Sequence, residues 1–348
     1  MKMYDLKVGI VGLGEQTTDN LLPSLILNHY ASVSAICDID ERKLNSIGEK
    51  TGIKNRYTCY KQMIQEAKPD VVVVSSFPEV HFEVAKYCIL HGIHIFVEKP
   101  PVSNTEQLNE LIGLSQFTSI KTGVGMNFSY TDSHKTLKEI ISDIEFGKIS
   151  FISVEHVSSK PVTPLWHLDT TIDSFLLAQL IHPLDYILSV GGSYHSINVH
   201  CSRLHSPFFI QIMIEFDNGI IGCLKSGSFY PRFKHEVEII STTGNTVKAN
   251  DLASIEITKI DIPTPFNVRS KNCTTLYTQS PLKSGYSKAG YIIEFNSYFE
   301  HILFNTDYKH SFSKMHHVYV ALDQIRYAIH NKNKDRHLRH DVSISKAM

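Results

Sequence analysis

Two glycines and a more distant aspartate have the types and spacing that suit recognition of a dinucleotide. Gly12 and Gly14 follow an apolar run at residues 7–11 and precede a helical pattern. Glycines here allow a tight turn and bring the backbone close to a pyrophosphate, while the helix N-terminus supplies N–H groups and a positive dipole end. Asp38 ends the second apolar run, where a carboxylate accepts hydrogen bonds from both ribose hydroxyls. The pattern predicts a site for a dinucleotide cofactor.

The residues around Asp38 favour NAD over NADP. Ile39 follows it in place of a basic residue, and Asp40 adds a second charge that repels a 2′-phosphate. Arg42 is close enough to keep NADP as an alternative. Thr17 replaces the third glycine of the usual fingerprint, a position that normally allows close packing of helix and strand. The structural alternative is an α/β fold in which Asp38 only caps a helix.

A lysine at the end of another apolar run is the first candidate for proton chemistry. Lys99 lies in the sequence Glu98-Lys99-Pro100-Pro101, directly after the run at residues 94–97. Ligands of open α/β sheets bind beyond the carboxyl ends of the strands. An ammonium group there stabilises a developing alkoxide and orients a substrate, and Glu98 can hold the lysine or contact the cofactor. The alternative is a surface lysine before a turn.

A histidine in an apolar helical stretch is the second candidate. His182 lies in residues 175–188, where apolar residues recur at helical spacing, and Pro183 follows it. Because proline has no backbone N–H, we expect the helix to break or restart there and to leave His182 near a helix N-terminus. The positive dipole end would favour the neutral imidazole, which is a base. Asp185 shares this face and can orient the ring or bind substrate. The alternative is a satisfied histidine in a core helix.

Alternating strand and helix signals position the first candidates. Near-continuous apolar runs are typical of strands buried on both faces of a parallel sheet. They occur at residues 7–11, 33–37, 71–74, 94–97 and 121–124. Helical patterns lie between them at residues 41–50 and 80–90, and a capping-box pattern begins at Ser103. This alternation predicts a doubly wound α/β domain.

The pattern changes near residue 126. Longer strands are predicted at residues 149–157, 208–216, 220–228, 236–241 and 254–260, with a hairpin turn at Asn218-Gly219. Residues 261–287 are rich in Pro, Ser, Thr and Lys and are predicted to form a long loop, and helices are expected at residues 291–303 and 313–330. The second part therefore reads as an α+β domain with an antiparallel sheet.

Composition excludes several classes of protein. The length of 348 residues suggests about two domains, and 42% hydrophobic with 20% charged residues excludes wholesale disorder. A net charge of −1 argues against nucleic-acid binding held by bulk positive charge. No apolar stretch of membrane-spanning length occurs, and the N-terminus leaves no room for a signal peptide, so no membrane partner is expected. The six cysteines lack close spacing, which indicates reduced thiols in a cytoplasmic protein; no metal site is expected.

Several segments together resemble the glucose-fructose oxidoreductase / inositol dehydrogenase (Gfo/Idh/MocA) family. The order and spacing of the segments are those of the family, and the resemblance covers nearly the whole chain. The segments are SSFPEVH (75–81), HGIHIFVEKP (91–100), GVGMNFSY (123–130), IHPLDYILSVGG (181–192) and the C-terminal YFEHILFNTDYKHSFSKMHHVYVALDQI. The resemblance implies a Rossmann domain, expected over residues 1–126, and a C-terminal α+β domain with an open, mostly antiparallel sheet, expected over residues 127–348. The C-terminal helix is expected to pack back on the first domain.

The resemblance also implies an activity and a set of site residues. It implies NAD(P)-dependent hydride transfer between nicotinamide C4 and a sugar, cyclitol or related secondary alcohol or ketone, with His182 as general acid/base. Lys99, His182 and Asp185 are the expected catalytic residues, and Lys99, Trp166, Gln179 and His182 the expected substrate-binding residues. The expected cofactor-binding residues are Gly12, Gly14, Glu15, Gln16, Asp38, Ile39, Ser75, Ser76, His81, Glu98, Lys99 and Asn127.

Two departures from the family pattern affect the substrate side. Ala178 stands where many relatives carry Asp or Asn, so help with proton transfer is expected from Asp173, Gln179 or the substrate. Ser129 stands where relatives often have Arg. Three alternatives stay open: an imine reductase, redox-neutral glycoside cleavage with tightly held NAD, and a non-catalytic NAD-binding sensor. An exposed face of the second sheet is expected to be buried in a homodimer or homotetramer.

Overall fold

The chain folds into two compact units. The computed structural model describes residues 5–260, 272–280, 282–283 and 285–345. The first unit comprises residues 1–131 and 280–317, and the second comprises residues 132–279 and 318–348. Residues 280–317 were expected in the second domain but group with the first unit. The assignment of residues 1–126 to cofactor binding and of residues 127–348 to substrate binding and oligomerisation stays a prediction.

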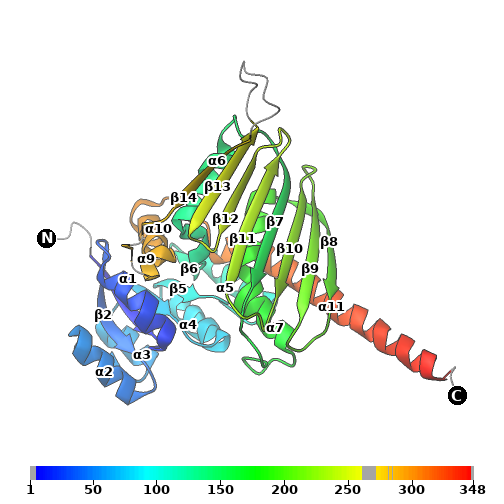
Figure 1. The fold of residues 1–348 in the computed structure, drawn as a ribbon. Coiled ribbons are helices and arrows are strands. Elements are labelled where there is room, and N and C mark those ends of the chain that lie inside the picture. Colours follow the sequence, from blue (N-terminus) through cyan, green and yellow to red (C-terminus); the bar gives the residue numbers. More distant parts are fainter. Residues whose placement is uncertain (1–4, 261–271, 281, 284, 346–348) are drawn as a thin grey trace. The chain divides into compact units, whose positions relative to one another are not determined.

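A six-stranded, wholly parallel sheet organises the first unit (Figure 1). The strand order is β3-β2-β1-β4-β5-β6. The strands are β1 (Leu6–Val11), β2 (Ala31–Cys37), β3 (Arg56–Tyr57), β4 (Val71–Val74), β5 (His94–Glu98) and β6 (Thr122–Gly125). The order reverses between β1 and β4, where ligands of such sheets bind beyond the carboxyl ends. The predicted doubly wound fold is confirmed, although the two-residue β3 had no sequence signal.

Helices connect these strands as the sequence pattern predicts. They are α1 (Leu22–Ile26), α2 (Glu41–Thr51), α3 (Tyr60–Ala67), α4 (Pro78–Leu90) and α5 (Thr105–Ser115). One predicted start is wrong by a residue, because Asn104 and not Ser103 caps α5 by accepting a hydrogen bond from the Gln107 amide (2.9 Å). The Ser103 hydroxyl instead donates to Glu79 (3.1 Å), so it is occupied elsewhere.

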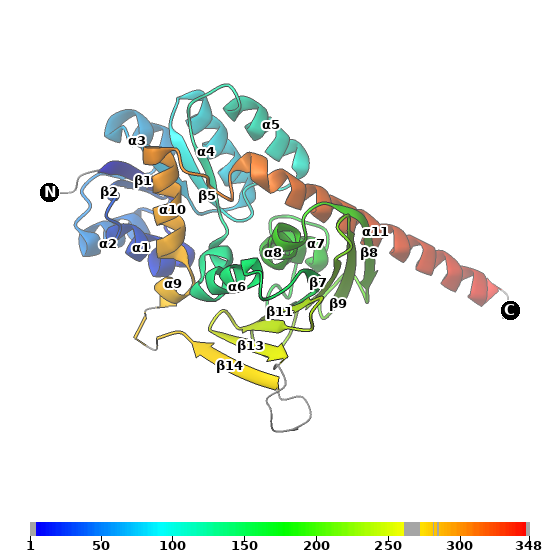
Figure 2. The ribbon, with the colours of Figure 1, turned by 90° about the horizontal axis from the view of Figure 1, so that it is seen from above.

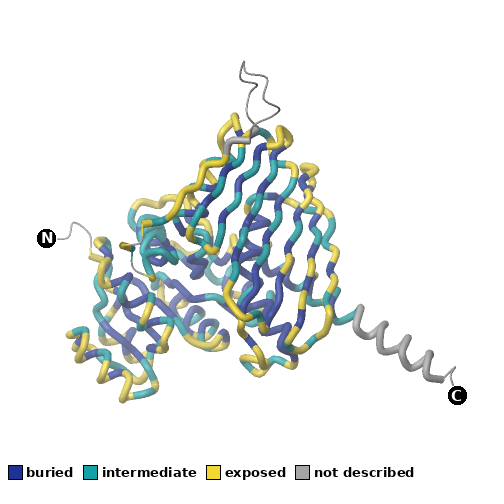
Figure 3. The backbone as a smooth tube through the Cα atoms, viewed as in Figure 1, coloured by how far each residue is buried: buried dark blue, intermediate teal, exposed yellow. Residues whose placement is uncertain are grey.

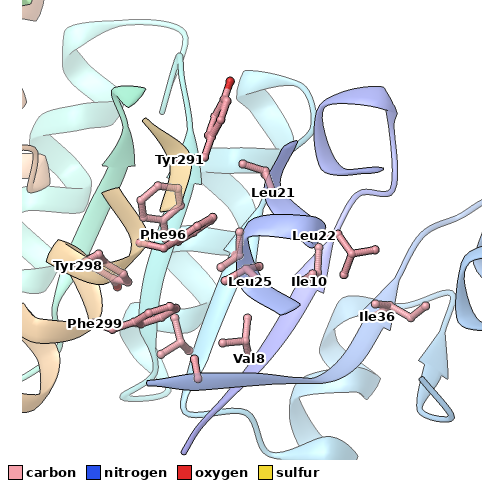
Figure 4. Close-up of a cluster of buried hydrophobic side chains, with 14 of the residues drawn as sticks. Val8, Ile10, Leu21, Leu22, Leu25, Ile36, Phe96, Tyr291, Tyr298 and Phe299 are labelled. Atoms are coloured by element: carbon pink, nitrogen blue, oxygen red, sulfur yellow. The ribbon is translucent and has the colours of Figure 1, made fainter. Parts of the chain in front are cut away.

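Helix α10 (Tyr291–Phe304), distant in sequence, covers part of the same sheet beside α1 (Figure 4). The Phe96 ring on β5 lies 4.9 Å from that of Phe295 and 5.3 Å from that of Tyr298, between ring centroids. A Cβ built on Gly123 of β6 would lie 2.8 Å from the Tyr298 ring, so α10 packs directly against the strand. Burying each such aromatic side chain contributes about 1.5–3 kcal/mol, which explains why this segment belongs to the first unit.

The second unit contains an eight-stranded sheet in the order β14-β13-β12-β11-β7-β10-β9-β8. Neighbouring strands are antiparallel except for the parallel pair β7 and β10, so the predicted mostly antiparallel sheet is confirmed. The strands are β7 (Ile149–Val157), β8 (Tyr194–Cys201), β9 (Phe209–Phe216), β10 (Ile221–Gly227), β11 (Lys234–Ser241), β12 (Thr246–Asn250), β13 (Ser254–Ile260) and β14 (Asn272–Thr278).

The two faces of this sheet differ. Helices α6 (Asp132–Ser142), α7 (Thr171–Phe175) and α8 (Ile181–Gly191) lie on one face (Figure 2). Burial alternates along each central strand (Figure 3), and within the described chain of this unit no helix covers the outer face. A charge ladder, which we define as Lys225, Glu155, Lys234, Glu236 and Lys248, crosses the outer face with N–O distances of 3.0–3.3 Å.

Three predictions for the second half need correction. The predicted loop over residues 261–287 is wrong in part, because β14 pairs with β13 and α9 (Gly285–Lys288) follows it; residues 261–271 lie outside the described chain. Strands β8 and β12 were not identified. Helix α11 (Phe312–Ser345) continues beyond the predicted end at residue 330.

Helix formation is continuous from Thr171 to Gly191. This stretch is long and apolar enough to pass a length-and-composition test for a membrane span, and most of it is buried inside the protein. Its burial is that of a core helix of the second unit. The expected break at Pro183 does not occur: a π-helical segment, Leu176–Leu180, leads directly into α8. A π-helical turn inserts an extra residue, so Pro183, which lacks an N–H, falls in the first turn after the change of pitch.

Candidate functional site

A glycine turn follows β1 at the carboxyl edge of the first sheet. Gly12 has φ +89°, and a Cβ there would lie 2.0 Å from the Ser75 carbonyl oxygen, so only glycine fits. A Cβ on Gly14 would meet no atom within 4 Å, so this glycine borders open space in front of the helix that begins at Glu15. Thr17 occupies the third glycine position, and its hydroxyl donates to the Gly12 carbonyl (2.7 Å) within the turn. A side chain at Gly14 would occupy the space that a pyrophosphate needs, so the turn fits the predicted cradle.

Asp38 lies against this turn. One carboxylate oxygen accepts a hydrogen bond from the Leu13 amide (2.7 Å), and the other accepts from the Asp40 amide (2.9 Å). The carboxylate is therefore fixed beside the glycines, and each oxygen has a further lone pair for a ribose hydroxyl. Ile39, next in sequence, is 91% exposed. These positions fit the ribose end of a dinucleotide.

A partly buried polar network joins the glycine turn to the end of β5. Gln16 donates its side-chain amide to Glu98 (3.1 Å) and to the Tyr291 hydroxyl of α10 (2.8 Å). The Lys99 amide donates to the second Glu98 oxygen (3.2 Å). Burial raises the pKa of Glu98 and lowers that of Lys99, and each charge opposes the shift of the other. A lysine whose pKa is lowered in this way can hold or release a proton closer to neutral pH.

Glu294 is a member of this region that the sequence analysis missed. It lies on α10, is fully buried and accepts a hydrogen bond from the Met126 amide (2.5 Å). Burial, with repulsion from Glu98, raises its pKa well above the ordinary value and so favours the neutral acid. The sequence signal for Glu294 was an acidic residue within an otherwise apolar helical pattern. Asn127, a predicted cofactor residue, donates its side-chain amide to the Ala289 carbonyl (2.8 Å), close to the start of this helix.

His81, a predicted cofactor residue, is held by backbone atoms on both sides of its ring. It is fully buried, and its Nε2 accepts a hydrogen bond from the Ser76 amide (2.8 Å). Its Nδ1 lies 2.8 Å from the Pro100 carbonyl oxygen, which only accepts, so Nδ1 carries the proton. Burial lowers the pKa of His81 to about 4, and the ring is neutral. His81 therefore ties the end of β4 to the loop that carries Lys99.

Two substrate-side candidates of the second unit, His182 and Asp185, lie on α8. Both are buried in the first turn and a half of this helix. Because the helix is continuous, His182 has no free helix N-terminus beside it, and the expected dipole effect does not apply. Asp173, expected to help proton transfer, is instead bonded to Thr170 (2.5 Å), His330 (3.1 Å) and Arg326 (3.3 Å), which fixes the helix start.

The remaining predicted residues have more accessible positions. Gln179 accepts a hydrogen bond from His156 (3.2 Å) and is half-buried. Trp166 is also half-buried and, like His167, has a left-handed backbone (φ 53° and 57°) in the loop before α7. In the first unit, Glu15 and Ser76 are exposed, whereas Ser75 is half-buried. Within that unit the structure brings together Gly12, Gly14, Gln16, Asp38, Glu98 and Lys99 at one edge of the sheet.

Two protein-family models match the sequence of this chain. The family model "Oxidoreductase family, NAD-binding Rossmann fold" matches residues 6–126, and the model "GFO/IDH/MocA C-terminal domain" matches residues 134–247. The first unit thus contains an NAD-binding Rossmann domain over residues 6–126.

Curated relatives and solved structures agree. Myo-inositol 2-dehydrogenase of Thermotoga maritima is 26% identical over 195 residues, which are 56% of this chain and 52% of that protein, so the alignment spans about half the length of the relative. A dehydrogenase from Chromobacterium violaceum is 28% identical with a TM-score of 0.90, over 97% of this chain and 99% of that one. Levoglucosan dehydrogenase, solved with NADH and L-sorbose, shares the fold (TM-score 0.80, 19% identity, 94% and 97% coverage).

Two consecutive family models, one for each part of the chain, match more than half of its residues in the expected order. The chain belongs to the Gfo/Idh/MocA oxidoreductase family.

Proposed function

We propose that this protein is an NAD-dependent oxidoreductase that acts on a secondary alcohol or ketone of a sugar or cyclitol. The observation that carries the proposal is the pair of buried Glu98 and half-buried Lys99 at the end of β5, tied through Gln16 to the helix that follows the glycine turn. When bound, NAD accepts or donates hydride at nicotinamide C4. The family membership and the inositol and sugar dehydrogenases among the relatives support this substrate class.

The first unit handles charge at the reacting oxygen. Lys99 would donate a hydrogen bond to that oxygen and stabilise negative charge as it develops. Glu98 keeps the lysine from becoming fully neutral, because its carboxylate favours the ammonium form. Gln16 and the Lys99 amide hold the two Glu98 oxygens, so the pair has a fixed geometry. His81 holds the Pro100 carbonyl and thereby the loop on which Lys99 lies.

The second unit supplies the proton-exchanging group. His182 would take up the hydroxyl proton during oxidation and return it during reduction, as general base and acid. Asp185 would orient the ring or bind a substrate hydroxyl, and Trp166 would pack against the sugar ring. NAD is proposed over NADP because Asp38, fixed by two backbone amides, would repel a 2′-phosphate.

A screen with added cofactor tests the function. Purified protein should bind NADH with a change in nicotinamide fluorescence, and a panel of sugars, nucleotide sugars and cyclitols should include a compound that changes nicotinamide absorbance. Lys99→Ala and His182→Ala should each abolish that change while the circular dichroism spectrum stays that of the wild type. Full activity of both variants would refute the proposed chemistry.

A second candidate is a non-catalytic NAD-binding sensor. Ala178 carries no acid, and the nearby Asp173 carboxylate is occupied by His330 and Arg326, which favours weak or absent turnover. This candidate predicts NADH binding without turnover of any compound in the same panel.

The outer face of the second sheet supports a proposal about assembly. We propose that a second copy of the chain covers this face in a homodimer or homotetramer, in the cytoplasm. The face has no covering helix among the described residues of its unit and presents the charge ladder together with exposed Phe209 and Ile221. Light scattering of the purified chain tests the assembly.

A further inference from the structure

Three buried histidines of the second unit are in contact through their ring nitrogens. We call this set the imidazole relay; its members are His134 on α6, His156 on β7 and His235 on β11. Their exposed fractions are 3%, 0% and 1%. The register of β7 and β11 places His156 directly opposite His235, with the two Nδ1 atoms 3.2 Å apart. The second nitrogen of His235 lies 3.4 Å from Nε2 of His134.

The relay ends on the side chain of Gln179. Nε2 of His156 lies 3.2 Å from the amide oxygen of Gln179, which can only accept a hydrogen bond. Nε2 of His156 therefore carries a proton. Gln179 belongs to the π-helical segment that leads into α8, three residues before His182.

If all three rings are neutral, the hydrogen bonds of the relay can all form with only one set of donors and acceptors. Burial, with repulsion from His156, His134 and His182, lowers the pKa of His235 well below its ordinary value, so its ring has one proton near pH 7. If His156 donates from Nε2, its Nδ1 must accept from Nδ1 of His235. Nε2 of His235 must then accept from Nε2 of His134. Each ring donates toward Gln179, and the tautomer of every member follows from the one before it.

The relay also determines which way the side-chain amide nitrogen of Gln179 faces. Residues 171–188 are all described, and Gln179 is the one position among them whose side chain is not buried. Its oxygen is held inward by His156. The amide nitrogen, which branches from the same carbon, then faces away from the relay and has only N–H groups to offer.

We propose that the imidazole relay fixes Gln179 as a hydrogen-bond donor that positions an oxygen acceptor of the substrate. The inference rests on the proposed function and narrows its substrate class. A hydroxyl, carbonyl or carboxylate oxygen fits this position, whereas an ammonium group of an amino sugar would meet donors and be rejected. Gln179 is the residue that contacts substrate, and His156, His235 and His134 are positioning residues.

The first test reads the relay without any activity. Long-range proton–nitrogen correlation spectra of the imidazole rings at neutral pH identify the protonated nitrogen of each histidine. The expected result is a proton on Nε2 of His156, on Nδ1 of His235 and on Nε2 of His134. Reversed tautomers or a doubly protonated ring would overturn the inference. This readout depends on the fold alone, so it stands even if no substrate is turned over, which is how failure of the proposed function would appear.

The second test uses the best substrate of the panel. Gln179→Glu keeps the shape and the inward oxygen but replaces the donor with an acceptor, and should raise KM about tenfold or more while kcat changes much less. His156→Leu, which cannot donate to Gln179, should raise KM similarly. His156→Gln offers an N–H near the position of Nε2 and should restore most of the affinity. The exposed His195, outside the relay, provides a matched control in His195→Asn, with an unchanged KM.

These outcomes separate a positioning role from a structural one. A merely structural role for His156 would lower the melting temperature and leave KM alone, and His156→Gln would then give no selective rescue. An unchanged KM in folded Gln179→Glu protein would overturn the inference. Should His156→Leu fail to fold, Gln179→Glu and the tautomer spectra still decide it.

Discussion

Each unit has a buried polar network, and the two networks use opposite chemistry. In the first unit the polar groups include two carboxyl groups: Gln16 links Glu98 to Tyr291, and Glu294 accepts from the Met126 amide. In the second unit the network is built on imidazoles, the relay of His134, His156 and His235, and ends on Gln179. Burial raises the pKa of Glu294 and lowers that of His235, which favours the neutral form of each, whereas the charges of Glu98 and Lys99 oppose each other's shift.

The comparison shows why Lys99 differs from the neutral buried groups. A neutral network fixes hydrogen-bond direction and therefore geometry, as His81 and the relay do. Lys99 differs because a carboxylate, Glu98, opposes the effect of burial and keeps a charge within reach in a low-dielectric setting. We therefore expect Lys99 to carry the largest functional effect, and the neutral groups to act mainly on position and stability.

The largest predicted effect is on turnover in Lys99→Met. The methionine keeps the length of the side chain but cannot donate a hydrogen bond or carry charge, so kcat/KM should fall by about 10²–10⁴-fold. Steady-state kinetics with the best substrate measures this, and NADH fluorescence titration provides the control for cofactor binding. Lys99→Arg keeps the charge and should retain more activity. Wild-type turnover in Lys99→Met would remove the distinction between the charged pair and the neutral networks.

The next effect is on the glycine turn. Gly12→Ala places a Cβ 2.0 Å from the Ser75 oxygen in a left-handed backbone, so the free energy of unfolding should fall by about 1–3 kcal/mol or more and NADH binding should be lost. Gly14→Ala meets no atom and should leave stability almost unchanged while weakening NADH binding about tenfold or more. Urea unfolding and fluorescence titration separate the two variants. Equal NADH affinity in Gly14→Ala and wild type would place the pyrophosphate elsewhere.

His81 gives a pH-dependent effect with a defined sign. Its folded pKa of about 4 lies below the ordinary value of 6.5, so the unfolded chain gains this proton first as the pH falls. The stability that wild type holds above pH 6.5 should decrease between pH 6.5 and 4, by up to about 3 kcal/mol from this ring. His81→Gln lacks this dependence. Unfolding free energies at several pH values should therefore show the wild-type advantage shrinking in acid; a constant difference would contradict the buried neutral ring.

Glu294 should give a pH dependence of stability with the opposite sign, because its folded pKa is raised. The unfolded chain therefore loses this proton first as the pH rises above the ordinary value of 4.5. Its contribution is present in acid and is lost as the pH approaches the folded value. Glu294→Gln keeps an oxygen for the Met126 amide and has no titration, so the variant should gain stability relative to wild type as the pH rises. A variant that loses stability with rising pH would mean that the buried acid is ionised.

The sequence predicted the parts of the site that are local in the chain. The glycine turn, Asp38 and Glu98-Lys99 each follow a strand, and strand ends are visible as apolar runs. His81 was predicted as a cofactor residue, which stays a prediction; its bonds to backbone atoms of Ser76 and Pro100 could not be predicted, because backbone atoms leave no trace in residue types. The relay could not be predicted: its members lie on α6, β7 and β11, and only the register of the sheet brings His156 opposite His235. The helix through His182 was predicted to break because the extra residue of a π-helical turn has no simple pattern.

The smallest predicted effect concerns the charge ladder, whose ion pairs are partly exposed to solvent. Lys248, at one end of the charge ladder, is 37% exposed and lies 3.3 Å from Glu236. In the monomer, Lys248→Ala should lower the free energy of unfolding by less than about 1 kcal/mol, and added salt should reduce the difference further, since solvent screens exposed ion pairs. Light scattering beside the unfolding measurement shows whether the chain is monomeric. If a second copy covers this face, the same substitution leaves Glu236 desolvated without one of its partners, and the loss should exceed that limit and vary with protein concentration.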